Sequence, residues 1–136
     1  MRSALLLGVV VAQCTVNQPP EAARVVLTQA MPVLDGAHLN VTLVEVRYAP
    51  GAGSAPHSHP CPVIGHVLEG ALRTQVRGGP SQVYRAGESF YEAPNGIHEV
   101  SANASDREPV RFVATFVCDH ETPRSVPVPS SSRTTP

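Results

Sequence analysis

Two histidines separated by a single residue, His57 and His59, are the side chains of this sequence best placed to do chemistry. On a β-strand, residues i and i+2 project from the same face, so both imidazoles can converge on one point. A metal ion needs such convergence, and neutral imidazole is a common ligand of Zn, Cu, Fe and Ni. By itself, a His-x-His pair fits two ordinary surface or core histidines equally well. A third histidine, His98, follows 39 positions after His59.

Both histidine segments lie within longer motifs. Five residues separate Gly51 from His57, and Gly70 closes this first block; Pro94-Asn95-Gly96 precedes His98 in the second, which begins at Gly87. The two blocks resemble the two motifs of the cupin superfamily, across roughly residues 22–118. The second block departs from the family spacing by one residue before Pro94, between Gly96 and His98, and before Asn103. The resemblance implies an all-β fold, a single double-stranded β-helix or jelly-roll barrel of the small conserved-barrel (cupin type 2) kind.

The resemblance also carries metal-ligand roles onto His57, His59 and His98. The glutamate that the family places in its first motif falls here on Val63, which cannot bind a metal ion. The resemblance therefore implies a three-histidine site of the kind found in certain thiol, diketone and gentisate dioxygenases. Three neutral imidazoles leave the full charge on a divalent ion, which favours anionic or chelating substrates and leaves coordination positions open.

Two nearby residues could replace the missing ligand. His66 comes three positions after Val63, so strand alternation places it on the opposite face unless a bulge intervenes. It would otherwise lie behind the ligands or on the outer sheet. Cys61 follows His59 by two positions, and a thiolate is a good ligand for soft metals; otherwise it simply lines the mouth of the pocket.

Glu92 is the one candidate for acid–base chemistry, because it ends a predicted strand just before Pro94. Carboxylates in turns are mostly solvated, and this favours the alternative in which Glu92 is an exposed turn residue. His38 and His120 lie outside both motifs and are interpreted as ordinary histidines.

The function predicted from these residues is a metal-dependent enzyme, an oxygenase acting on a small molecule with Fe(II) on the three histidines. One alternative is a non-catalytic module that binds or senses a small molecule, since a cupin barrel offers an apolar cavity. Another is a non-redox isomerase or lyase that uses Zn, Ni or Mn. Oxygen consumption with candidate substrates separates the first from the others.

Composition excludes several other classes. The 10 Lys and Arg residues against 11 Asp and Glu give a formal net charge of −1, so the basic footprint of a nucleic-acid-binding protein is absent. The sequence has no G-x-S-x-G motif and no phosphate-binding G-x-x-x-x-G-K-[ST] loop, and it contains no Lys.

Short valine-rich runs separated by Gly and Pro must position the candidate site. About nine strands with frequent turns favour a sandwich or barrel, and no window carries the apolar spacing of an amphipathic helix. A clear hairpin is expected at the Glu69-Gly70 turn, and a change of face near Leu43-Val44 predicts a bulge. The expected strands are Arg24 to Ala30, His38 to Tyr48, Val63 to Leu68, Ala71 to Val76, Gln82 to Arg85, Ser89 to Glu92, His98 to Ser101 and Val110 to Cys118.

The two ends of the chain differ from its centre. Arg2 followed by the uncharged run 4–12 fits a secretory signal, which divides the chain into a leader (1–20), a barrel (21–120) and a Pro/Ser/Thr-rich tail (121–136). The alternative for the leader is a buried first strand, Leu5 to Ala12. A signal peptide implies a periplasmic or extracellular protein, and its absence a cytoplasmic one. The tail is expected to be disordered from Ser125 onward.

The cysteines and the oligomeric state are less constrained. If Cys14 is removed with the leader, Cys61 and Cys118 remain, and they could form a disulfide. Two buried thiols are the favoured alternative, because a sequence does not show whether the two residues meet at disulfide geometry. The family resemblance makes a homodimer the expected assembly.

Overall fold

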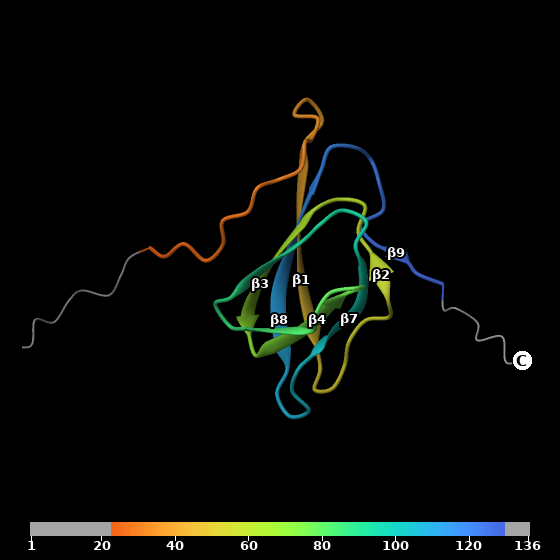
Figure 1. The fold of residues 1–136 in the computed structure, drawn as a ribbon. Helices are drawn as coiled ribbons and strands as arrows, with labels where there is room; N and C mark the ends of the chain where they lie inside the picture. The colour runs from red at the N-terminus through yellow and green to blue at the C-terminus, as the bar shows by residue number, and fades with distance from the viewer. Residues whose placement is uncertain (1–22, 130–136) are drawn as a thin grey trace, which may run out of the picture.

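The computed structural model describes residues 23–129, and these form nine β-strands (Figure 1). In chain order they are β1 (Asn40–Tyr48), β2 (His57–Ser58), β3 (Val63–Glu69), β4 (Ala71–Val76), β5 (Gln82–Arg85), β6 (Ser89–Glu92), β7 (Ile97–Asn103), β8 (Val110–Cys118) and β9 (Val126–Pro127). The described residues contain no helix of the length and apolarity that a membrane span requires. The all-β prediction is confirmed.

The strands build two antiparallel sheets. One has the order β1-β8-β3-β6 and the other the order β5-β4-β7-β2-β9. Most neighbours in each sheet are distant in sequence, as in β1 with β8 and β2 with β7. This pattern of crossovers is that of a jelly-roll barrel, in which two sheets share one interior.

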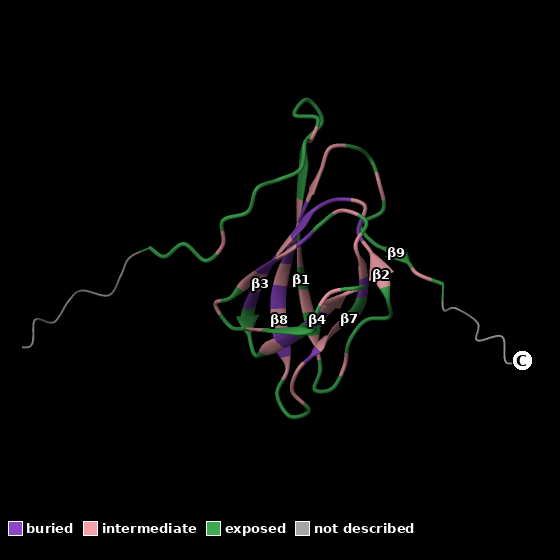
Figure 2. Ribbon diagram, in the orientation of Figure 1, coloured by how far each residue is buried: buried purple, intermediate pink, exposed green. Residues whose placement is uncertain are grey.

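The core lies between the two sheets and consists of strand residues that alternate inward (Figure 2). Val63 and Val67 of β3 are 1% and 0% exposed. The other core members, from β4, β6 and β8, are Leu72, Phe90, Val110, Phe112, Ala114 and Phe116. Because side chains alternate with period two, every second residue of β8 enters this core.

Two glycines allow β3 to join its neighbours. A Cβ on Gly65 would lie 2.1 Å from the ring of Phe90, so only glycine lets that ring lie across β3. Gly70 has φ of +73°, and it makes the tight connection between β3 and β4. The hairpin predicted at Glu69-Gly70 is thereby confirmed.

Two local predictions are wrong. The segment from Arg24 to Ala30 forms no strand, and nearly all of it is exposed, because no sheet edge pairs with it. β1 has no bulge, since it pairs with β8 in one unbroken register from Asn40↔Cys118 to Tyr48↔Val110. Its apolar Leu43 is simply exposed on the outer face.

The cysteines and the C-terminal segment also differ from the favoured predictions. Cys61 and Cys118 form a disulfide with Cα atoms 5.2 Å apart, so the interpretation as two free thiols is wrong. The expectation of disorder from Ser125 onward is wrong for Val126 and Pro127, which pair with β2. The leader (1–20) lies outside the described residues.

Candidate metal centre

The structure brings the three predicted histidines together inside the barrel. β2 pairs with β7 so that His57 lies directly opposite His98, and His59 follows immediately after β2. Ring centres are 4.8 Å apart for His57 and His59, 5.4 Å for His57 and His98, and 5.5 Å for His59 and His98. Imidazoles that share one ion at Zn–N distances near 2.1 Å have ring centres roughly 4.5–5.5 Å apart, so this spacing fits a common ion.

Backbone carbonyls fix two of the three rings. His57 Nδ1 lies 2.8 Å from the carbonyl oxygen of Ala55, and His59 Nδ1 lies 2.6 Å from that of Arg124. A carbonyl only accepts hydrogen bonds, so each Nδ1 carries the proton and donates it. In the neutral rings Nε2 is therefore the atom with the free lone pair, which is the form a ligand requires.

A carboxylate lies among these imidazoles, and it belongs to Glu92. Its Oε2 atom is 3.1 Å from His98 Nε2 and 3.5 Å from His59 Nε2. The side chain enters the barrel because β6 pairs with β3 in a register that sets Glu92 directly opposite Val63. Residues facing each other across an antiparallel pair share a face of the sheet. Glu92 thus supplies a carboxylate beside the position at which the family motif expected one.

The prediction that Glu92 is a solvated turn residue is wrong, since it is only 8% exposed. The proximity of Glu92 to Pro94 suggested a turn, but β6 extends through Glu92 before the turn begins. The signal available in the sequence was the alternation of Ser89 to Glu92, which places Phe90 and Glu92 on one face. That signal is weak without the β3–β6 register.

Two buried atoms of this cluster lack a hydrogen-bond partner: Glu92 Oε2 and His98 Nε2. Buried polar atoms are nearly always satisfied, and the 3.1 Å contact between these two is met either by a proton on His98 Nε2 or by a cation that both atoms share. The chemistry of the set, three imidazole nitrogens and one carboxylate oxygen, suits Zn, Fe, Ni or Mn. The residues present therefore fit a divalent metal ion.

The proximity of these side chains does not amount to ligand geometry. Within residues 23–129, no group of three or more His, Cys, Asp or Glu side chains is arranged as a metal-binding cluster. Burial lowers the pKa of His59, an effect that outweighs the Arg124 carbonyl and the Glu92 charge. A lowered pKa keeps this ring neutral, and so available as a ligand, at neutral pH.

Neither proposed replacement ligand reaches the centre. Cys61 is engaged in the disulfide with Cys118, so it has no thiolate to offer. His66 lies on the face of β3 opposite to Val63 and Val67, and its Nδ1 is 2.8 Å from Ser89 Oγ. Both candidates are therefore wrong as metal ligands.

A bulge in β7 adds a residue that the sequence analysis did not identify. The β4–β7 register shifts between Gln75 and Val76, next to His98. Residues i and i+3 of a regular strand face opposite sides, but an extra residue lets His98 and Ser101 line the same cavity. The hydroxyl of Ser101 lies 3.3 Å from that of Tyr48, which enters from β1.

Two neighbouring hollows share the histidines in their linings. An inner cavity of about 80 Å³ is lined by Val44, Val46, Tyr48, His57, His59, Val63, Glu92, His98, Ser101, Phe112, Ala114 and Phe116. An outer mouth of about 310 Å³ is lined by Tyr48, Ser54, Ala55, Pro56, His57, His59, Ser125 and Pro127. Tyr48, His57 and His59 line both, so these three side chains lie between the mouth and the interior. Larger hollows lie elsewhere, between the N-terminal segment and β5 and beside His38, but neither contains the converging histidines.

Asn103, the last residue of the second motif, stabilises two loops of the barrel and does not contact the candidate metal centre. Its side-chain amide donates to the carbonyl oxygens of Ala49 and Glu108, at 3.1 Å and 2.7 Å. Its oxygen accepts from the backbone N–H of Ser105 at 2.9 Å. These bonds tie the loop before β8 to the loop after β1.

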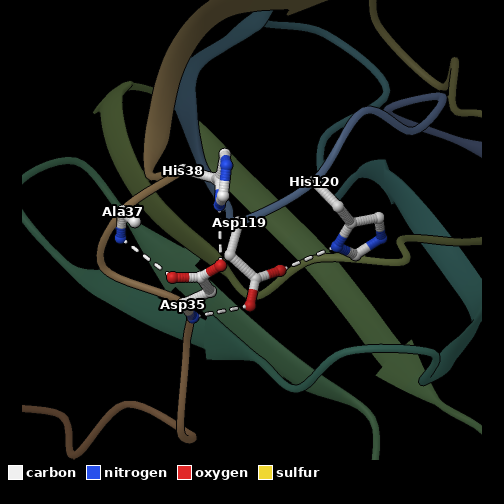
Figure 3. A network of polar contacts seen from close by, with 5 residues as sticks. All are labelled: Asp35, Ala37, His38, Asp119 and His120. Atoms are coloured by element: carbon white, nitrogen blue, oxygen red, sulfur yellow. Dashed lines mark hydrogen bonds and ion pairs between the residues drawn. The ribbon is translucent and has the colours of Figure 1, made fainter.

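His38 and His120 belong to a separate cluster on the surface (Figure 3). His38 Nδ1 lies 2.7 Å from Asp35 Oδ2, and His120 Nδ1 lies 2.7 Å from Asp119 Oδ1. The backbone N–H of Asp35 donates to Asp119 Oδ2 at 2.9 Å and joins the two pairs.

The sequence and the fold both match known proteins. The family model described as "Cupin domain" matches residues 44–116, which is more than half of the chain. Among curated proteins, none matches the chain. A cupin-like protein from Thermotoga maritima superposes with a TM-score of 0.58 at 24% identity, over 69% of this chain and 68% of that one.

Two enzymes are also similar in structure. The polyketide cyclase RemF from Streptomyces resistomycificus has a TM-score of 0.56 at 23% identity, over 73% of this chain and 69% of its own. A mutant of the Bacillus subtilis oxalate decarboxylase has a TM-score of 0.54 at 26% identity, over 65% of this chain. The match spans only 24% of that decarboxylase.

Proposed function

The chain belongs to the cupin domain family, and we propose from this that it is a metal-dependent enzyme acting on a small molecule. The ion would be held by His57, His59, His98 and Glu92. The observation that carries the proposal is the pair of buried, unpartnered atoms, Glu92 Oε2 and His98 Nε2, that face each other 3.1 Å apart. Glu92 would add a carboxylate to the three histidines that the sequence predicts as ligands.

The fourth ligand changes the expected electrostatics. A divalent ion on three neutral imidazoles keeps a charge of +2, whereas a bound carboxylate lowers it to +1. Among residues 23–129, no Arg side chain lines the inner cavity or the mouth. We therefore expect a weaker preference for highly anionic substrates than the three-histidine prediction implied.

The chain's own residues define how a ligand would be held. The aromatic and aliphatic lining, including Phe112 and Phe116, excludes water and limits the enclosed part of a ligand to a few heavy atoms. The Tyr48 and Ser101 hydroxyls can donate to an oxygen of that ligand. The Nδ1–H groups of His57 and His59 stay bonded to the backbone, so neither ring is free to rotate away.

Fe(II) and an oxygenase reaction are the first identities to test. Three nitrogen ligands and one oxygen ligand leave two positions of a six-coordinate iron open, and bound iron there would supply redox chemistry with O₂. The second candidate is a lyase or isomerase that uses Zn, Ni or Mn. The similarity in structure to a cyclase and a decarboxylase supports this candidate.

We also propose that the protein is exported. The Cys61–Cys118 disulfide supports this, because such bonds persist mainly in oxidising compartments. Detection of the mature protein in the periplasm or the medium, shortened at its N-terminus, would test the proposal.

The function is tested in two steps. Elemental analysis after anaerobic loading with Fe(II), Zn, Ni or Mn should give about one ion per chain. Oxygen consumption with a panel of small substrates then separates an oxygenase from a lyase or isomerase. A protein that holds no metal under any loading condition would refute the proposal, and a ligand-induced rise in Tm without turnover would favour a binding module.

A further inference from the structure

The segment that follows the last long strand, residues 118–128, runs back across the barrel to the candidate metal centre. We propose that this segment, here named the C-terminal strap, is a positioning element that sets the ring of His59 through the carbonyl oxygen of Arg124. The inference rests on the proposed metal site, since the orientation of His59 matters for an ion bound at its Nε2.

The first attachment of the strap is covalent. The disulfide joins Cys118, at the end of β8, to Cys61, two residues after His59. Cys61 is 3% exposed, and the backbone N–H of Val117 donates to the carbonyl of Pro62 at 3.1 Å. The start of the strap is thereby fixed to the same loop that carries His59.

The second attachment is a strand pair at the far end. In β9, Val126 lies opposite Ser58 and Pro127 opposite His57. The backbone N–H of Val128 donates to the carbonyl of Pro56 at 3.2 Å. β2 would otherwise be an edge strand on this side, so the strap completes its sheet (Figure 1).

Between the two attachments, the strap makes its contact with the site. The Arg124 carbonyl oxygen accepts a hydrogen bond from His59 Nδ1 at 2.6 Å. This bond selects the tautomer with a free Nε2 lone pair and fixes the direction of the ring. Ser125 and Pro127 also line the outer mouth beside His57 and His59.

The side chains of the other three proposed ligands, His57, His98 and Glu92, take no hydrogen bond from this segment, although the backbone of His57 pairs with Pro127. His57 takes its carbonyl from Ala55, two residues away in the same loop, and Glu92 is placed by the β3–β6 register. His59 alone relies on a residue 65 positions later in the sequence. Lengthening the strap between its two attachments, with the β2–β9 pair kept, should therefore affect His59 first.

The test compares two insertions of a Gly-Gly pair in the full chain. Placed between Glu121 and Thr122, the insertion lengthens the strap between its attachments; placed after Pro129, it lies beyond them and is the matched control. Co(II) affinity is measured by chelator competition, and the side-chain ¹⁵N shifts of His59 are measured without metal. Loss of a hydrogen bond behind a metal-binding histidine typically lowers metal affinity about 10- to 100-fold.

We expect that fall in Co(II) affinity for the first insertion, with the His59 nitrogens changing from a fixed Nδ1–H form to a mixture of tautomers. The control should match wild type in both measurements. Unchanged affinity and an unchanged His59 tautomer in the folded first variant would overturn the proposal. If that variant does not fold, the Cys61→Ser/Cys118→Ser double variant, which frees the other attachment, is judged by the same two results.

The tautomer measurement separates this inference from the proposed function. Wild-type protein that binds no Co(II) refutes the metal site, while a fixed His59 Nδ1–H form lost in the first insertion still supports the positioning role.

Discussion

Two clusters of histidines and carboxylates in this molecule contain the same kinds of side chain but in different arrangements. In the surface cluster, each imidazole is paired through Nδ1 with a carboxylate close in sequence, His38 with Asp35 and His120 with Asp119 (Figure 3). In the interior cluster, the Nδ1 atoms of two rings are bonded to backbone carbonyls, and Nε2 atoms face the shared carboxylate of Glu92.

The difference shows what makes a histidine available to a metal ion. In the surface cluster a carboxylate occupies Nδ1, and the His38 side chain is 71% exposed. A backbone carbonyl on Nδ1 of a buried ring favours the neutral form with a free Nε2. In the interior cluster, burial lowers the pKa of the His59 ring. The Glu92 Oε2 atom is buried there without a hydrogen-bond partner.

The largest expected contrast is in metal content. His98→Ala removes a ring that is 2% exposed and central to the interior cluster, so stoichiometric binding of Zn or Fe(II) should be lost. His38→Ala removes a ring of the surface cluster and should leave binding unchanged. Elemental analysis of both variants and of wild type gives the metal content per chain. Equal losses of metal in the two variants would contradict the assignment of the ion to the interior cluster.

The next contrast tests where the carboxylate comes from. Glu92→Val should lower metal affinity by about 10-fold or more, as expected when a ligand and its charge are removed. Because residues 63 and 92 face each other across β3 and β6, the double variant Val63→Glu/Glu92→Val moves the carboxylate to the opposite strand. Its affinity, measured by chelator competition, should recover at least partly. A double variant no better than Glu92→Val would place the carboxylate outside the ligand set.

A smaller effect concerns stability without metal. Glu92→Gln replaces a buried carboxylate without a partner for its Oε2, so the free energy of unfolding of the metal-free protein should rise by about 1–3 kcal/mol. Asp119→Asn acts on the solvent-screened surface cluster and should leave the free energy of unfolding close to that of wild type. Urea unfolding in the presence of a chelator gives both values. Destabilisation by Glu92→Gln would mean that the carboxylate already has a stabilising partner.

The smallest effects are in the pH dependence of stability. The pKa of His59 is lowered in the folded state, so below about pH 6.5 the unfolded chain binds more protons. Stability of the metal-free protein should then fall as the pH drops from there, by at most about 1.4 kcal/mol per pH unit for one group. His59→Gln should flatten this slope. A slope at pH 5–6 that is the same in both proteins would contradict the assignment.

The surface cluster titrates in a different window. The hydrogen bond with His38 lowers the pKa of Asp35, and the backbone N–H of Asp35 lowers that of Asp119. Folded pKa values below 3.8 give stability that is present above that pH and is lost as the pH falls further. Asp35→Asn should lower the stability measured by urea unfolding at pH 6, and the difference from wild type should shrink as the pH falls below about 4. A difference that stays the same from pH 6 to pH 3 would mean that another contact is involved.

Much of the fold followed from local pattern, while the site depended on register. The hairpin at Gly70 is predicted by its turn residues, and β8 is predicted by the period-two alternation of its residues. Both signals are local in the sequence. The meeting of Glu92 with His59 depends on how β3 pairs with β6, two segments whose register no local pattern specifies. The same holds for Ser101, because the bulge that turns it inward belongs to a strand pair.

The failures near the chain ends have a similar cause. The segment from Arg24 to Ala30 has the composition of a strand, yet no free edge pairs with it. The strap has the composition of a loose tail, yet the disulfide and β2 hold it in place. In both cases the decisive partner is distant in sequence.

The most direct test is an anomalous-scattering map of crystals loaded with Zn or Fe(II), recorded at the absorption edge of the metal. We expect one strong peak inside the barrel, within bonding distance of Nε2 of His57, His59 and His98 and of a Glu92 carboxylate oxygen. A peak at His38 and His120 instead, or an interior peak that Glu92 does not contact, would contradict the account of the buried centre.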